Sequence, residues 1–123
     1  VIILRQTRQR FPEKVDFITS PGYLDGRPGQ REESGLLPGT GPVTVITDMG
    51  VYRFRDREMV LKSVHAGLGM SVEDCRREVG WDLQVDPHLE TTEPPTDEEL
   101  QILREKVDPS GIFVGGKFAL KEM

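Results

Sequence analysis

The stretch from Pro42 to Gly67 constrains the fold more than any other part of the chain. It contains three short runs rich in β-branched and aromatic residues, at 43–47, 51–54 and 59–61. Asp48-Met49-Gly50 separates the first two runs, and Asp56-Arg57-Glu58 separates the last two. Runs of this kind between turn residues are typical of successive strands in a β-meander. We therefore expect this stretch to form the core of a β-sheet.

Three further apolar runs predict additional strands, at Val1–Leu4, Val15–Thr19 and Trp81–Val85. The first run is continuously apolar, which predicts a buried strand. Ser20-Pro21-Gly22 should end the second strand, and Pro87 should close the third, because proline and glycine favour turns.

Ser71 marks the start of one predicted helix, because serine is a favoured N-cap residue and acids follow it in the first turn. Its apolar positions fall on one face with the spacing of a helix: Val72, Cys75 and Val79. Gly80 fits the position just after the helix. We therefore expect Cys75 to be a core residue, since nothing near it in sequence would lower the pKa of its thiol.

A second helix should begin at Thr96, because Glu99 three residues later completes a capping box. Its apolar stripe consists of Leu100, Leu103 and Val107. Asp108-Pro109-Ser110-Gly111 should end this helix.

The segment 20–42 is rich in proline and glycine. A loop of this length in a compact domain is usually functional or disordered. Within it, Gly39-Thr40-Gly41-Pro42 superficially resembles a phosphate-binding loop. However, no Gly-Lys-Ser/Thr follows, and the segment leads into a strand rather than a helix. We therefore interpret it as a connector.

Length and charge limit the possible functions. The 123 residues fit one domain, and the net charge of −5 argues against a general nucleic-acid binder. No apolar run approaches the roughly 20 residues of a membrane span. The apolar run at the start of the chain is too short for a signal peptide. Because the chain begins with Val1 inside a β-branched run, we expect a processed, trimmed or partial chain. Cys75 is the only cysteine, which fits a reducing compartment, and we expect a cytoplasmic protein.

No catalytic constellation is visible in the residues themselves. His65 and His88 are far apart in sequence, and no Cys/His cluster has the spacing of a zinc site, so we predict no metal. A spatial triad stays possible, but there is no G-x-S-x-G motif. His65 follows a predicted strand, and we expect it to be satisfied by local hydrogen bonds rather than to be catalytic. From the residues alone, we predict an α/β domain.

Five stretches together resemble the β subunit of type I CoA-transferases, in particular that of the glutaconate CoA-transferase type. Their order and spacing extend through most of the chain: Phe17–Tyr23, Gly41-Pro42 together with Val45–Val51, Ser63–Gly67, Thr92–Thr96 and Ile112–Gly115. The resemblance implies the C-terminal half of such a subunit over residues 1–123. It also implies an open, mixed α/β sheet with flanking helices, forming an incomplete half of the subunit fold.

In this family, a glutamate in the N-terminal half attacks the acyl-CoA carbonyl, and a glutamyl-CoA thioester carries CoA to the acceptor acid. A glycine-rich oxyanion loop belongs to the same missing part. No glutamate here matches the nucleophile's motif, so the resemblance implies no catalytic residue in this chain, which should be inactive alone. It implies as partners an α subunit and the N-terminal half of the β subunit. Acyl-CoA and a carboxylic acid are the implied substrates, with CoA a substrate rather than a permanently bound cofactor.

The sequence also suggests where a ligand could lie. Ligands of open α/β sheets bind beyond the carboxyl ends of strands. The predicted strand Val15–Thr19 would deliver Ser20, Pro21, Gly22 and Tyr23 to such a place, as candidate substrate-binding residues. The alternative is that these residues only form a turn.

Two other functions stay open at this point. Relatives that hydrolyse ring carbon–carbon bonds of CoA thioesters lack the nucleophilic glutamate, and the half that would discriminate them is absent from this sequence. A non-catalytic assembly module is the third possibility, because a half sheet with an open edge needs a partner.

Overall fold

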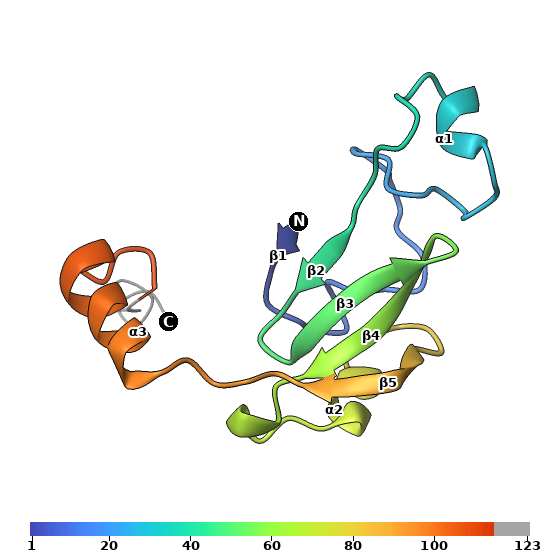
Figure 1. Cartoon of the computed structure of the whole chain (residues 1–123). Coiled ribbons are helices and arrows are strands. Elements are labelled where there is room, and N and C mark those ends of the chain that lie inside the picture. The colour runs from blue at the N-terminus through green and yellow to red at the C-terminus, as the bar shows by residue number, and fades with distance from the viewer. Residues whose placement is uncertain (115–123) are drawn as a thin grey trace. The chain divides into compact units, whose positions relative to one another are not determined.

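The computed structural model describes residues 1–114 (Figure 1). Gly115, the last residue of the matching stretches, lies outside the described residues. The chain divides into two compact units, Val1–Thr92 and Glu93–Met123, and each is described by itself. That residues 1–123 belong to one CoA-transferase-like domain stays a prediction.

The first unit is built on a five-stranded mixed sheet with strand order β1-β2-β3-β4-β5. The predicted meander forms its centre as β2 (Thr44–Ile46), β3 (Gly50–Arg55) and β4 (Glu58–Val64). These three strands pair antiparallel, with Tyr52 opposite Leu61. The outer strands β1 (Ile2–Ile3) and β5 (Gln84–Thr91) pair in parallel with β2 and β4. The predicted mixed α/β sheet is therefore confirmed.

The turn between β2 and β3 is held by the side chain of Thr47. Its hydroxyl oxygen accepts hydrogen bonds from the backbone N–H groups of Met49, at 3.0 Å, and Gly50, at 3.1 Å. Thr47 itself is buried. The predicted Asp48-Met49-Gly50 break therefore forms a tight turn with its backbone groups satisfied.

The N-terminal region differs from the prediction in two ways. A strand forms at Ile2–Ile3, but Val1 and Ile3 are 81% and 76% exposed, so the expected burial is wrong. β1 lies at the edge of the sheet, with β2 its neighbour on one side. The predicted strand Val15–Thr19 does not form, and residues 15–19 are exposed irregular chain. An apolar run fixes a strand only where another strand pairs with it.

β5 is longer than predicted and begins later. Trp81 precedes the strand, and Pro87 lies inside it instead of closing it. The pairing with β4 shifts between Leu61 and Ser63, so that residues 86–89 lie opposite Lys62 alone. An edge strand with such an irregularity tolerates proline, because the missing N–H is not needed for the ladder.

Helix α2 (Val72–Arg77) contributes to the core of this unit through Cys75, which is buried, and Val72, which packs against the buried cluster. Ser71 caps it as predicted and forms a capping box with Asp74. The buried cluster combines residues of the sheet, of α2 and of the chain around them: Phe11, Val45, Tyr52, Leu61, Val64, Cys75, Val79 and Leu83.

Gly80 has a different role from the predicted one. The helix cap is Glu78, so Gly80 does not occupy the position directly after it. The Gly80 N–H instead donates to the carbonyl of Phe11 at 2.7 Å. A Cβ at this position would lie 2.4 Å from the backbone nitrogen of Glu13. Glycine is required here because two backbone segments approach closely.

The segment 20–42 is largely irregular. It contains the short helix α1 (Gln30–Glu33), which was not predicted. In Figure 1, α1 lies beyond the end of β2, away from β5.

The second unit contains α3 (Asp97–Ile102), which continues as the π-helical turn η2 (Leu103–Val107). The predicted capping box of Thr96 and Glu99 is present. Of the predicted apolar stripe, Leu100 and Leu103 are half-buried, whereas Val107 is 66% exposed. Within residues 1–114, no helix has both the length and the apolar character to span a membrane.

Candidate functional site: an arginine-lined hollow

The four predicted site residues lie in irregular chain rather than at the end of a strand. The structure therefore removes the reason for which Ser20–Tyr23 were singled out, since no strand at Val15–Thr19 delivers them. The segment is nevertheless held in place from across the loop. Arg31 Nη1 donates to the carbonyl of Pro21 at 2.9 Å and also to the carbonyl of Gly22.

Tyr23 connects this loop to the sheet. Its hydroxyl donates to the carbonyl of Pro42 at 2.8 Å, and its ring packs against Phe54 of β3 with ring centroids 5.2 Å apart. The Arg31 guanidinium lies over the ring, 5.8 Å from its centroid, in a cation–π contact. A Cβ on Gly41 would come within 3.0 Å of the Tyr23 ring, so glycine leaves room for it.

These contacts form one wall of a hollow of about 370 Å³. Of the four predicted residues, Tyr23 lines it, whereas the lining does not include Ser20, Pro21 or Gly22. Loop residues and the tip of the β3–β4 hairpin supply the walls: Tyr23, Arg27, Gly29, Gln30, Arg31, Glu32, Gly39, Thr40, Asp56 and Arg57. Its volume falls in the range of small-molecule sites.

The three arginines of the hollow are in different electrostatic situations. Arg27 pairs with Glu33 through two hydrogen bonds, at 3.0 and 2.6 Å, and this carboxylate raises the pKa of the Arg27 guanidinium. Arg31 donates to Thr40 Oγ1 at 3.0 Å, and its buried Nε has no hydrogen-bond partner. Arg57 Nε donates to the carbonyl of Gly26 at 2.8 Å. Within residues 1–114, neither Arg31 nor Arg57 forms an ion pair with a carboxylate.

Arg57 also has an unusual backbone. Asp56 and Arg57 form the two-residue turn of the β3–β4 hairpin with φ angles of 48° and 69°. Such turns normally contain Asn-Gly or Gly-Gly, because a side chain at positive φ is strained. The sequence therefore contained a signal: a hairpin turn with arginine where glycine would fit better. The convergence of Arg31 with Arg57 had no such signal, since it depends on how the loop folds.

His65 is satisfied locally, as predicted. Its Nε2 lies 3.0 Å from the carbonyl oxygen of Thr47, and its Nδ1 lies 2.9 Å from Thr92 Oγ1. A carbonyl can only accept, so we assign the proton to Nε2, and Thr92 then donates to Nδ1. Ser63 Oγ is 2.9 Å from the same Thr92 oxygen. The imidazole thus links the ends of three strands and has no ring nitrogen left for catalysis.

Cys75 is a core residue, as predicted. It is fully buried, and burial raises the pKa of its thiol, which disfavours the nucleophilic thiolate. Beside it, Gln6 satisfies a buried polar network that the sequence did not indicate. Gln6 Oε1 accepts from Tyr52 at 2.7 Å and from Thr47 at 2.9 Å, while its Nε2 donates to the carbonyl of Cys75 at 3.0 Å.

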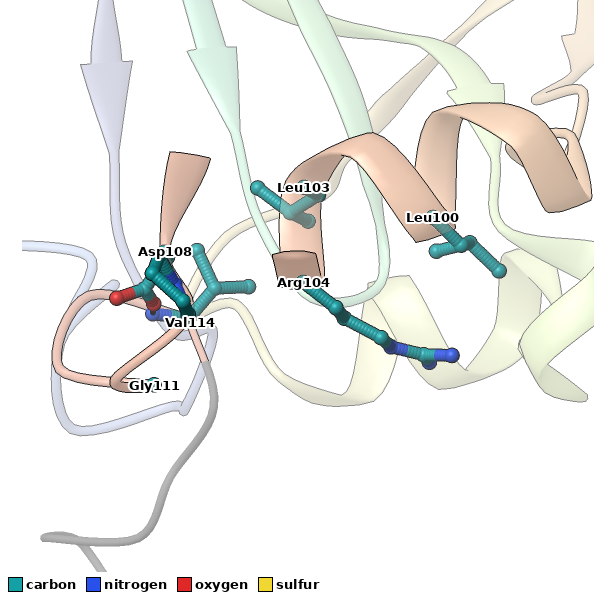
Figure 2. A pocket seen from close by; sticks show the side chains of 7 residues that line it. Leu100, Leu103, Arg104, Asp108, Gly111 and Val114 are labelled. Atoms are coloured by element: carbon teal, nitrogen blue, oxygen red, sulfur yellow. Dashed lines mark hydrogen bonds between the residues drawn. The ribbon is translucent and has the colours of Figure 1, made fainter. Parts of the chain in front are cut away.

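The second unit has a larger cavity of about 510 Å³, shown in Figure 2. Leu100, Leu103 and Arg104 line it from the helix, and Asp108, Gly111 and Val114 from the turn that follows. The Asp108 carboxylate accepts hydrogen bonds from the backbone N–H groups of residues 112, 113 and 114, at 2.8 to 3.0 Å. This carboxylate therefore shapes the turn.

Among the described residues, no group of three or more His, Cys, Asp or Glu side chains could hold a metal ion.

Sequence comparison finds relatives among the CoA-transferases. No family model matches the chain. The β subunit of glutaconate CoA-transferase from Acidaminococcus fermentans is 35% identical over 116 residues, covering 93% of this chain and 42% of the relative. The β subunit of 3-oxoadipate CoA-transferase from Pseudomonas knackmussii is 34% identical over 106 residues, which cover 85% of this chain and 39% of the relative. The chain thus spans about two-fifths of the length of these relatives.

Structural comparison agrees. The crystal structure of the Acidaminococcus fermentans glutaconate CoA-transferase superimposes with a TM-score of 0.83 at 33% identity, covering 92% of this chain and 43% of that one. The decarboxylase AibA/AibB superimposes with a TM-score of 0.64 at 24% identity, over 89% of this chain and 39% of that one, which shows a shared fold. The chain is therefore homologous to a stretch of the β subunits of the glutaconate and 3-oxoadipate CoA-transferases.

Proposed function

We propose that this chain is part of a CoA-transferase β subunit that moves CoA from an acyl-CoA to a carboxylic acid. The observation that carries the proposal is the agreement with the glutaconate CoA-transferase β subunit in both sequence and backbone, over more than nine-tenths of this chain. The fold alone would not suffice, because a decarboxylase shares it at lower identity.

In the proposed mechanism, a glutamate outside this chain attacks the acyl-CoA carbonyl, and the C–S bond breaks to give a mixed anhydride and the CoA thiolate. The thiolate attacks the glutamyl carbonyl of this anhydride, which releases the donor carboxylate and leaves a glutamyl-CoA thioester. The acceptor carboxylate repeats the same two steps on the glutamyl-CoA, which forms the new acyl-CoA and frees the glutamate. No glutamate in this chain matches the nucleophile's motif, which supports a nucleophile elsewhere. The thiol of Cys75 is buried with a raised pKa, and both ring nitrogens of His65 are occupied. CoA enters as a substrate and is not permanently bound.

The role of this chain in that mechanism is to position substrate and partner chains. An α subunit is the proposed partner, in keeping with the names of the relatives, each of which is one subunit of its enzyme. The open edge of β1, with Val1 and Ile3 exposed, supports contact with further polypeptide, which we propose to be the rest of the β subunit. Nucleic acid and membrane are not proposed as partners. The proposed compartment is the cytoplasm.

Ser20, Pro21, Gly22 and Tyr23 stay proposed substrate-binding residues, on new grounds. Tyr23 lines the hollow, and the carbonyls of Pro21 and Gly22 hold Arg31 at its wall. Ser20 is proposed only because it is adjacent to Pro21 in the sequence.

The test is an activity assay on the complete β subunit combined with its α subunit. The enzyme is given an acyl-CoA and a different carboxylic acid, and the new acyl-CoA is measured by chromatography. The proposal expects transfer by the complete enzyme and none by residues 1–123 alone. Hydrolysis or ring opening without transfer would instead support a CoA-thioester hydrolase. Complex formation without any turnover would support a non-catalytic assembly module.

A further inference from the structure

We propose that the arginine-lined hollow binds a phosphoryl group and, resting on the proposed function, that this group is a phosphate of CoA. Arg31 and Arg57 would contact it, and Asp56 would weaken its binding. The net charge of the chain is −5, so the attraction must be local.

Charge is arranged in favour of an anion at this hollow. Arg31 belongs to α1 and Arg57 is at the tip of the β3–β4 hairpin, yet both line one hollow. Neither has a carboxylate partner within residues 1–114, whereas the third arginine, Arg27, is neutralised by Glu33. Two guanidinium groups with donors left over match the oxygens of a phosphoryl group.

The backbone at the hairpin tip is strained. Arg57 has a φ of 69°, where glycine would be unstrained. Strain of this kind marks functional positions, because the fold must hold it against a more relaxed alternative. The Nε of Arg57 is used by the carbonyl of Gly26, which fixes the plane of the guanidinium and leaves its two terminal nitrogens for a ligand.

The side chain of Arg31 is preorganised for an anion. Arg31 is fixed by the carbonyls of Pro21 and Gly22, by Thr40 and by the ring of Tyr23. A side chain held in this way loses little conformational entropy when an anion binds. Glu32 and Asp56 also line the hollow, and their carboxylates repel an anion. They predict that removing one of them tightens binding.

The experiment uses the complete α/β enzyme and measures dissociation constants by calorimetry for four probes. The probes are CoA, dephospho-CoA, pantetheine and inorganic phosphate. Arg57→Gly removes the guanidinium and relieves the strained turn, and Asp56→Asn removes a repelling charge. We expect Arg57→Gly to weaken CoA about tenfold, with Tm unchanged or raised. We expect Asp56→Asn to tighten CoA about two- to threefold, and pantetheine to bind all variants equally.

The probes locate the phosphate. Loss of affinity for CoA but not for dephospho-CoA assigns the hollow to the 3′-phosphate, and equal loss for both assigns it to the pyrophosphate. If Arg57→Gly weakens inorganic phosphate but leaves CoA unchanged, the assignment to CoA is overturned and a free phosphate is the ligand. If no phosphate-containing probe responds to either variant, the whole inference is overturned.

Failure of the phosphate-binding site and failure of the proposed function give different results. A wild-type enzyme that transfers CoA while Arg57→Gly binds CoA unchanged refutes the hollow as a CoA site and leaves the function standing. A wild-type enzyme that transfers no CoA refutes the function, whereas the titration with inorganic phosphate still tests the hollow.

Discussion

The sheet core and the arginine-lined hollow are organised by different kinds of interaction. In the core, Tyr52 and Leu61 lie opposite each other on β3 and β4, fully buried, and Cys75 of α2 belongs to the same buried cluster. At the hollow, individual polar contacts of Tyr23, Arg31 and Arg57 hold an irregular loop against a hairpin tip. Burial of apolar area contributes far more free energy than a few partly exposed hydrogen bonds. Stability should therefore reside in the core, and ligand recognition in the loop.

The largest effect should come from a cavity in the core. Leu61→Ala should lower the free energy of unfolding by about 2–5 kcal/mol, because Leu61 is fully buried between Tyr52 and the α2 side of the core. Urea unfolding measures the change. The matched control is Leu37→Ala in the loop, where the side chain is 74% exposed and the change should stay within about 0.5 kcal/mol. Equal losses for the two variants would contradict the division between core and loop.

A second strong effect should come from the contact at Gly80. Gly80→Ala would place a Cβ 2.4 Å from the backbone nitrogen of Glu13, so the two segments must separate. We expect a loss of about 1–3 kcal/mol, measured by urea unfolding. Gly67→Ala is the control, since no atom lies within 4 Å of the position that its Cβ would take. A neutral Gly80→Ala would show that this contact does not constrain the core.

The stability of the core should also fall at alkaline pH. Burial raises the pKa of the Cys75 thiol and of the Tyr52 hydroxyl. Above about pH 8.5 the unfolded thiol loses its proton while the folded one keeps it, so stability falls as the pH rises. Tyr52 causes a further decrease in stability above about pH 10, where the hydroxyl of the unfolded chain loses its proton.

For each group, the free energy of unfolding should decrease by at most about 1.4 kcal/mol per pH unit. Unfolding curves recorded between pH 7 and 11 measure this decrease. Cys75→Ala should abolish the decrease in the free energy of unfolding that begins near the thiol's ordinary pKa of about 8.5. The decrease that Tyr52 causes at higher pH should remain. A profile that Cys75→Ala leaves unaltered would show that the thiol is not protected in the core.

The smallest effect should come from the loop. Tyr23→Phe removes the hydrogen bond to the carbonyl of Pro42 and keeps the ring against Phe54. The expected loss is about 0.5–1.5 kcal/mol. Hydrogen exchange should accelerate at amides of residues 21–42 and stay unchanged in β3 and β4. Faster exchange throughout the sheet would mean that the loop and the core unfold together.

The two regions also differ in what the sequence predicts. Alternating apolar residues and turn signals located β2, β3 and β4, and Ser71 and Thr96 located two helices, because these signals act over a few neighbouring residues. Val15–Thr19 has the composition of a strand but no partner to pair with, so the prediction was wrong. The predicted stop at Pro87 was wrong because the tolerance of β5 for proline depends on the edge position and the register shift.

The candidate site followed from the sequence only in part. Tyr23 was predicted, but on the basis of a strand that does not form. Arg31 and Arg57 are separated by the whole of β2 and β3, and their approach to one hollow follows from the hydrogen bonds of the loop. Gln6 was likewise invisible, since its role depends on Tyr52, Thr47 and Cys75 meeting around it.

We propose that this chain supports a CoA-transferase site whose nucleophile lies elsewhere in the β subunit. The most direct test is to incubate the complete enzyme with acyl-CoA, reduce it with borohydride and map the modified peptide by mass spectrometry. We predict a reduced glutamate outside residues 1–123, because no glutamate of this chain matches the nucleophile's motif of the family that the chain resembles. A reduced residue within 1–123, or no trapped thioester at all, would contradict the account.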